Sequence, residues 1–151
     1  MTDEGRRACR KKKFTVPRET QGRLELVRAL VRDEMARQNL ISKSSAEHIW
    51  ARHVVDSAQL LRHVPQVSTG QNIWLDLGTG AGFPGMVVAI LSNYDVRMVE
   101  SRARRIEFLE NVLERLDFSE KATVLGQRLE KIKSFPADVI SARAFAPLDR
   151  L

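Results

Sequence analysis

The sequence contains a single cysteine, Cys9, among its 151 residues. One thiol cannot form an internal disulfide, a CxxC redox pair or a zinc site built from several thiolates, so these arrangements are excluded. Long apolar runs are also missing. No segment approaches the roughly 18 apolar residues of a membrane-spanning helix, and no apolar stretch follows the N-terminal charges. We therefore expect a soluble, cytoplasmic protein with no membrane partner.

Proline and glycine are scarce too, with 5 and 8 residues, and aromatic residues make up only 6% of the chain. This composition excludes collagen-like and low-complexity chains. The hydrophobic fraction of 43% and the charged fraction of 29% are those of a folded protein. The length fits one domain, since a domain typically has about 100 to 200 residues.

Positive charge is concentrated at the N-terminus. Residues 1–18 contain seven cations and two anions, a local balance of +5, so the other 133 residues contribute only +1 to the net charge of +6. A segment with so little to bury is typical of a disordered tail. It is either an RNA-tethering arm, since clustered cations replace the counterions around phosphates, or a solvated extension that is dispensable.

Apolar spacing predicts two helices at the start of the folded part. Steps of three and four residues indicate a helix over residues 19–38. A second helical stripe ends near Pro65, and Ser44 with Glu47 three residues later fits a capping box at its start. We expect these helices to precede the first strand.

Strands and helices then alternate. Short apolar runs predict strands over residues 72–77, 96–99, 122–125 and 139–141, with helices over 86–91 and 102–116. Ser101 is a candidate cap for the second of these helices. Such alternation predicts an α/β fold with an open, parallel, doubly wound sheet, in which ligands bind beyond the carboxyl ends of the strands.

A glycine-rich loop, DLGTGAGFPG over residues 76–85, follows the first predicted strand. Gly78, Gly80 and Gly82 allow a sharp turn and close approach to a ligand. The third glycine comes one residue too early for the dinucleotide fingerprint, and no Gly-Lys-Ser/Thr follows, which disfavours NAD and FAD and excludes a Walker loop. Asp-x-Gly-x-Gly-x-Gly resembles motif I of the class I S-adenosylmethionine methyltransferases, which have a Rossmann-like sheet. Glu100, at the end of the second strand, can accept the ribose hydroxyls of such a cofactor.

Four segments resemble the RsmG family, also called GidB. They are RQNLIS over 37–42, RHVVDS over 52–57, the glycine loop over 76–85, and SARAFAPL over 141–148. The resemblance implies an enzyme that uses S-adenosyl-L-methionine to methylate a guanine N7 in 16S rRNA of the small ribosomal subunit. It also implies a chain that continues past Leu151. We accordingly expect a basic disordered tail over 1–18, a helical portion over 19–66 and a methyltransferase core over 67–151 that is incomplete at its C-terminus.

The family's cofactor contacts can be carried over to single positions of this chain. Glu100 takes the ribose position, Leu129 and Glu130 would frame the adenine, and Arg143 would face the cofactor's carboxylate or the RNA. The full set expected to bind the cofactor is Asp76, Gly78, Gly80, Gly82, Phe83, Glu100, Leu129, Glu130 and Arg143. No residue is assigned a catalytic role, because guanine N7 has an available lone pair and the main task is to position it.

Other readings remain open. The chain could methylate another RNA or a small molecule, or it could be a non-catalytic fragment that binds cofactor or RNA. His53 and Asp56 lie one helical turn apart and could form a hydrogen-bonded pair that supports the cofactor loop. The basic start of the helix at Arg102, Arg104 and Arg105 is either a phosphate-binding or a solvated face. We expect no metal site and a monomer.

Overall fold

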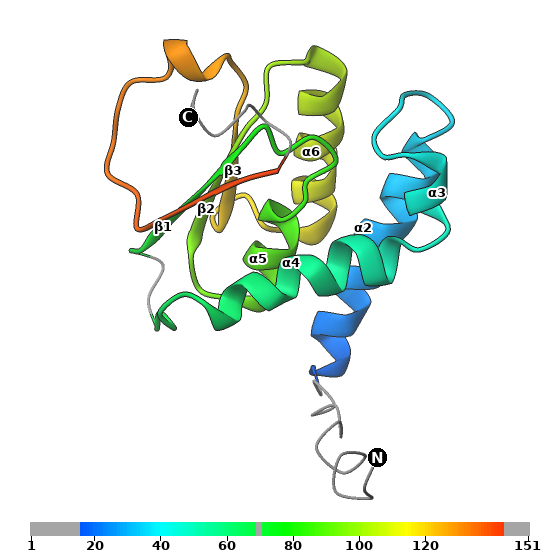
Figure 1. The fold of residues 1–151 in the computed structure, drawn as a ribbon, viewed down its shortest axis with the longest axis horizontal. Helices are drawn as coiled ribbons and strands as arrows, with labels where there is room; N and C mark the ends of the chain where they lie inside the picture. The colour runs from blue at the N-terminus through cyan, green and yellow to red at the C-terminus, as the bar shows by residue number, and fades with distance from the viewer. Residues whose placement is uncertain (1–15, 69–70, 144–151) are drawn as a thin grey trace, which may run out of the picture.

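The computed structural model describes residues 16–68 and 71–143 (Figure 1). Its centre is a four-stranded parallel sheet in the order β3-β2-β1-β4. The strands are β1 (Ile73–Leu77), β2 (Asp95–Val99), β3 (Ala122–Leu125) and β4 (Val139–Ala142). All four predicted strands are present, and the α/β fold with a Rossmann-like parallel sheet is confirmed.

The register brings the carboxyl ends of the strands to one edge of the sheet. Leu77 at the end of β1 pairs with Val99 of β2 and with Ala142 of β4, and Val99 pairs with Leu125 of β3. The residues that follow these ends therefore lie close together although they are far apart in the sequence. From β1 the chain continues outward to β2 and β3 on one side of the sheet. It then returns to form β4 on the other side of β1, so the winding direction reverses at β1.

Two helices connect the central strands. The first, α5 (Gly85–Leu91), follows β1 and packs against β1 and β2, and α6 (Ala103–Leu116) follows β2 and packs against β3. Both connections step in the same direction along the sheet, and parallel crossovers are right-handed, so both helices cover the same face. Residues 85–90 of α5 are all buried, which agrees with the apolar character of this helix on every side.

The N-terminal helices form a layer over α5 and α6. Helix α2 (Arg18–Glu34) contacts both of them and inserts its apolar stripe of Leu24, Val27 and Val31 into the common core. A near-continuous helical segment then follows and ends before Pro65 (Figure 1). Its parts are α3 (Lys43–Ala46), the π-helical turn η1 (Trp50–Val55), α4 (Asp56–Gln59) and the 3₁₀ turn η2 (Leu60–Arg62). Helix α4 packs on α5, so this segment and the sheet share one hydrophobic core.

Two predicted helix caps are wrong. Ser42, not Ser44, caps α3, because the Ser42 hydroxyl accepts the N–H of Ser45 at 3.1 Å. Helix α6 has Arg102 at its cap position with no side-chain cap from Ser101. Instead, Oε1 of Glu100 accepts the main-chain N–H groups of Ser101 and Arg102, each at 2.9 Å. Both N–H groups precede Ala103, the first residue of α6, so the carboxylate holds the residues that lead into the helix and is not a side-chain cap of its first turn.

The predicted disordered tail lies almost entirely outside the described residues, as does the part of the fourth family segment after Arg143. Within the described ranges, no helix is long and apolar enough to cross a membrane. A short 3₁₀ turn, η3 (Leu129–Lys131), lies between β3 and β4. It places Leu129 and Glu130 beyond the carboxyl end of β3, at the edge where the ligand is expected.

Candidate cofactor site

Three glycines shape the loop after β1. Gly78, Gly80 and Gly82 have φ angles of +63°, +59° and +94°, a region that other residues rarely adopt. A Cβ at Gly82 would also lie only 2.7 Å from Cγ of Met86 and 3.1 Å from Cδ2 of Leu109. The glycine at this position therefore permits both the turn and the close packing of the loop on α5 and α6.

Asp76 holds the glycine loop in place through hydrogen bonds to its side chain. Its carboxylate is fully buried and accepts the Thr79 hydroxyl at 2.6 Å, the Gly85 N–H at 3.0 Å and the Ser141 hydroxyl at 2.8 Å. Burial raises the pKa of Asp76, while these hydrogen bonds and the charge of Arg143 oppose that shift. The carboxylate thus ties the start and the end of the loop to strand β4.

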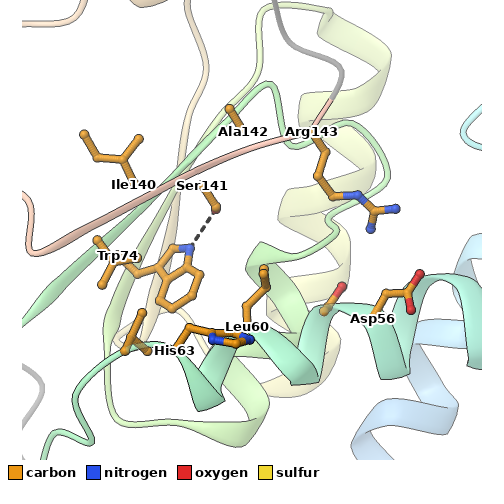
Figure 2. Close-up of a pocket in the computed structure, with 11 residues that line it drawn as sticks. Asp56, Leu60, His63, Trp74, Ile140, Ser141, Ala142 and Arg143 are labelled. Carbon is orange, nitrogen blue, oxygen red and sulfur yellow. Dashed lines mark hydrogen bonds between the residues drawn. The ribbon is translucent and has the colours of Figure 1, made fainter. Parts of the chain in front are cut away.

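This network continues into the sheet. The indole N–H of Trp74 donates to the Ser141 hydroxyl at 2.8 Å (Figure 2). That hydroxyl in turn donates to Asp76. Ser141 is therefore both acceptor and donor in a chain that runs from Trp74 on β1, through β4, to the glycine loop. Since the indole and the carboxylate are both buried, losing Ser141 would leave each without this partner.

A cavity of about 390 Å³ opens where β1, β2 and β3 end. We call it the loop cavity. It is lined by the last residue of β2, by residues that follow the three strands, and by one residue from α6. They are Gly78, Val99, Glu100, Ser101, Arg105, Gln127, Arg128, Leu129 and Glu130. Its volume falls within the range of about 300 to 1,000 Å³ that is common for small-molecule sites.

Glu100 is the central acid of the loop cavity, and only 6% of it is exposed. Besides the two N–H groups that Oε1 accepts, Oε2 accepts the N–H of Gly80 at 3.2 Å and lies 3.8 Å from Nη1 of Arg105. A carboxylate offers about four acceptor positions, and main-chain groups use three of them. One lone pair on Oε2 is left for a donor that enters the cavity.

Arg143 lines a different cavity, of about 520 Å³, which we call the β4 cavity. The cavity lies between β4 and the segment formed by α4 and η2. The Arg143 side chain extends from the end of β4 toward the helix that carries Asp56, and Trp74 and His63 line the other end of the cavity (Figure 2). This cavity is the larger of the two, but only the loop cavity collects residues that follow several strand ends, as a ligand site in a wound sheet should.

His53 supports the glycine loop in a way that differs from the prediction. Its ring stacks on Phe83 with centroids 5.0 Å apart and an angle of 23° between the planes. Within the described part of the chain, neither ring nitrogen has a hydrogen-bond partner, so the expected hydrogen bond with Asp56 is wrong. Burial is the main cause that lowers the pKa of His53, and the charge of Arg143 lowers it further. Asp56 opposes this shift, and Arg52 adds a still smaller lowering effect.

The structure brings together four of the nine predicted site residues in the loop cavity, namely Gly78, Glu100, Leu129 and Glu130. Asp76, Gly82 and Phe83 are buried and shape the loop instead of lining this cavity. Gly80 contributes its N–H to Glu100, and Arg143 lies in the β4 cavity. That these residues bind a cofactor stays a prediction.

Sequence reasoning missed Ser101, Gln127 and Arg128 as cavity residues and treated Arg105 as part of an outer basic face. The first three directly follow strands β2 and β3, so the rule that ligands bind beyond strand ends could have found them. Arg105 has no such signal. Its inward position depends on how the residues before α3 dock on α6.

Comparisons with known proteins identify the family. The family model described as "GidB: rRNA small subunit methyltransferase G" matches residues 22–151. A relative from Rhizorhabdus wittichii, named ribosomal RNA small subunit methyltransferase G, is 58% identical over 138 residues, which cover 90% of this chain and 62% of the relative. A relative of the same name from Zymomonas mobilis is 48% identical over 141 residues, covering 90% and 63%.

The chain therefore spans a little over three fifths of the length of these curated relatives. Among solved structures, one from Methanococcus maripaludis assigned to the S-adenosyl-L-methionine-dependent methyltransferases aligns with a TM-score of 0.55. It is 12% identical and covers 89% of this chain and 54% of that one, so the likeness concerns the fold alone. The sequence resemblance is thus confirmed, and the chain belongs to the GidB family of rRNA small subunit methyltransferase G proteins.

Proposed function

We propose that this chain carries the cofactor-binding core of an S-adenosyl-L-methionine-dependent methyltransferase that modifies a guanine N7 in 16S rRNA of the small ribosomal subunit. The observation that carries the proposal is the loop cavity, which combines a positive-φ glycine loop with a nearly buried acid at the end of the next strand. Family membership supports the choice of reaction and of RNA.

The residues of the loop cavity fit the proposed cofactor. Gly78 brings bare main chain to the cavity wall, so a ligand can approach the loop without meeting a Cβ. Leu129 offers an apolar side chain for one face of an adenine, and Glu130 offers an acceptor for its amino group. Arg128 and Arg105 are cations in the same wall, where Glu100 and Glu130 balance them.

Glu100 would accept a ribose hydroxyl on the free lone pair of Oε2. A second hydroxyl could be accepted only if it displaced a main-chain N–H, and the Gly80 N–H, at 3.2 Å, is the longest of the three contacts. Binding of both ribose hydroxyls would therefore weaken the hydrogen bond from Gly80 and change the position of the glycine loop. This links recognition of the cofactor to the position of the loop that holds it.

The reaction asks little of acid–base chemistry. When bound, the cofactor supplies a methyl group on a positively charged sulfur. Guanine N7 would receive that methyl group on its available lone pair, with the electron pair of the C–S bond left on sulfur, so no proton would have to be removed. The protein's contribution is to hold the two reactants in line, and positioning of this kind can supply about 7 to 11 kcal/mol.

We propose that Arg143 acts on the RNA side. It follows β4 across β1 from the loop cavity, and its guanidinium is suited to a phosphate or to a carboxylate. We expect the protein to act as a monomer in the cytoplasm, where its proposed substrate is made. Sedimentation velocity tests the first of these expectations.

Calorimetry with S-adenosyl-L-methionine is the direct test, and a chain that binds none would overturn the proposal. Glu100→Gln keeps an acceptor oxygen for the N–H groups of Ser101 and Arg102 but removes the charge, so it should weaken cofactor binding about tenfold. Glu110→Gln, which neutralises an exposed acid on α6, is the matched control and should bind like the wild type. Equal affinities of the two variants would remove Glu100 from the site.

Methyl transfer tests the substrate. Small ribosomal subunits from a strain lacking the modification are incubated with labelled cofactor and either this chain or a full-length relative such as that from Rhizorhabdus wittichii. Labelling of 16S rRNA at a guanine N7 by the full-length protein, with binding but no transfer by this chain, would identify the chain as a cofactor-binding part. Transfer only to other RNAs would contradict the proposed substrate.

A further inference from the structure

Arg105 differs from the other two arginines at the start of α6. Arg102 and Arg104 are exposed, whereas the Arg105 side chain is only 22% exposed and turns toward the loop cavity. Its Nη2 donates to the main-chain carbonyl oxygen of Asn39 at 3.2 Å. Its Nη1 lies 3.8 Å from Oε2 of Glu100, which is an ion-pair distance and too long for a hydrogen bond.

The same guanidinium lies beside the glycine loop. A Cβ built on Gly80 would be 3.8 Å from Nη1 of Arg105, so no other side chain separates the two. Arg105 therefore contacts three parts of the molecule: the loop, the acid at the end of β2, and the segment before α3. Only a forked cation can serve the carbonyl and the carboxylate with separate nitrogens, and lysine has a single one.

The segment before α3 is fixed at a second point nearby. Nε2 of Gln38 donates to the main-chain carbonyl oxygen of Arg104 at 2.9 Å. Leu40, two residues further on, is buried in the common core. Residues 38–40 are thus docked on the first turn of α6. The contact between Arg105 and Asn39 connects them to Glu100, the acid proposed to bind the cofactor.

We propose that Arg105 is a positioning residue that couples occupancy of the loop cavity to the docking of residues 37–42. This rests on the proposed function, because the occupant is taken to be S-adenosyl-L-methionine. A donor that binds Oε2 of Glu100 fixes the carboxylate opposite Arg105, and the fixed guanidinium holds the Asn39 carbonyl more firmly. By linkage, whatever contacts residues 37–42 then affects cofactor affinity to the same extent.

The test compares Arg105→Ala and Arg105→Lys with Arg104→Ala, which removes the same charge from an exposed neighbour and leaves its main chain intact. Cofactor affinity is measured by calorimetry, and amide exchange of residues 37–42 is measured with and without cofactor. We expect both Arg105 variants to bind about three- to tenfold more weakly, because neither keeps both contacts. We also expect cofactor to slow exchange in residues 37–42 of the wild type and of Arg104→Ala but not of the Arg105 variants.

The outcomes separate the two proposals. A wild type that binds no cofactor overturns the proposed function and this inference with it. A wild type that binds, while Arg105→Ala matches Arg104→Ala in affinity and in exchange, overturns only the inference. If Arg105 had only a structural role, its replacement would raise amide exchange across the whole domain, and that result would also overturn the inference. Arg105→Lys keeps the charge and serves as the second variant should Arg105→Ala not fold.

Discussion

At the residue scale, two glycines are expected to respond in opposite ways to replacement by alanine. Gly82→Ala should lower the free energy of unfolding by about 2 to 4 kcal/mol, since the new Cβ would combine backbone strain at φ +94° with overlap at Met86.

Gly22, inside α2, has nothing within 4 Å of such a Cβ. Gly22→Ala should raise stability by about 0.5 to 1 kcal/mol. Urea unfolding measures both, and a Gly82→Ala protein as stable as the wild type would contradict the packing described here.

The second residue-scale prediction concerns His53 and pH. Its pKa is lowered in the folded protein from 6.5, so the unfolded chain binds the proton more readily. The stability contribution is therefore fully present above pH 6.5 and is lost as the pH falls through that value toward the lowered pKa. His53→Phe keeps an aromatic ring against Phe83 and should lose this part of the acid-side decline in melting temperature.

His48→Gln is the control for the pH prediction, because His48 is an exposed histidine and takes no part in the stack of His53 on Phe83. It should keep the wild-type decline between pH 7 and pH 5. If His53→Phe also keeps that decline in full, then protonation of His53 does not oppose folding, and the stack on Phe83 would have to tolerate the charged ring.

At the scale of elements, Ser141 connects β4 to the glycine loop. Ser141→Ala removes one hydrogen bond from buried Asp76 and the acceptor of the Trp74 indole, so unfolding should become easier by about 1 to 3 kcal/mol. Ser101→Ala is a suitable comparison, because Ser101 does not cap α6, and alanine keeps the main-chain N–H that Glu100 accepts. A larger loss for Ser101→Ala than for Ser141→Ala in chemical denaturation would reverse this assignment.

The elements themselves could largely be predicted from the sequence. All four strands and helices α2, α5 and α6 follow from apolar spacing, because burial of one face fixes the pattern of residues along an element. The caps could not be predicted, since tertiary structure decides which side chain lies near the first N–H groups of a helix. Ser42 takes the place of Ser44 as the cap of α3, and α6 has Arg102 at its cap position with no side-chain cap.

Part of the site could also be predicted, from the rule that ligands bind beyond the strand ends. Residues directly after strand ends, such as Gly78 and Glu100, lie in the loop cavity as the topology requires. Contacts that depend on the docking of a distant segment were missed, and Arg105 is the clearest case. His53 was singled out because of its sequence neighbour Asp56, whereas its partner in space is Phe83.

At the scale of the whole molecule, the charge of the chain says less about RNA than its pI near 10.0 suggests. Residues 19–151 carry a balance of only +1, so any RNA contact of this part depends on where single cations lie. Of the four arginines considered for that role, Arg105 is used inside the protein. Arg102, Arg104 and Arg143 are left for a phosphate.

The chain that links Trp74, Ser141 and Asp76 also makes the protein suited to fluorescence spectroscopy. The sequence has two tryptophans, and the indole of Trp74 is 1% exposed and hydrogen-bonded to the network that holds the glycine loop. With Trp50 replaced by Phe, the remaining emission would come from a single ring at this junction. Its intensity and lifetime would then report changes in this network, at the wall of the β4 cavity, without any attached dye.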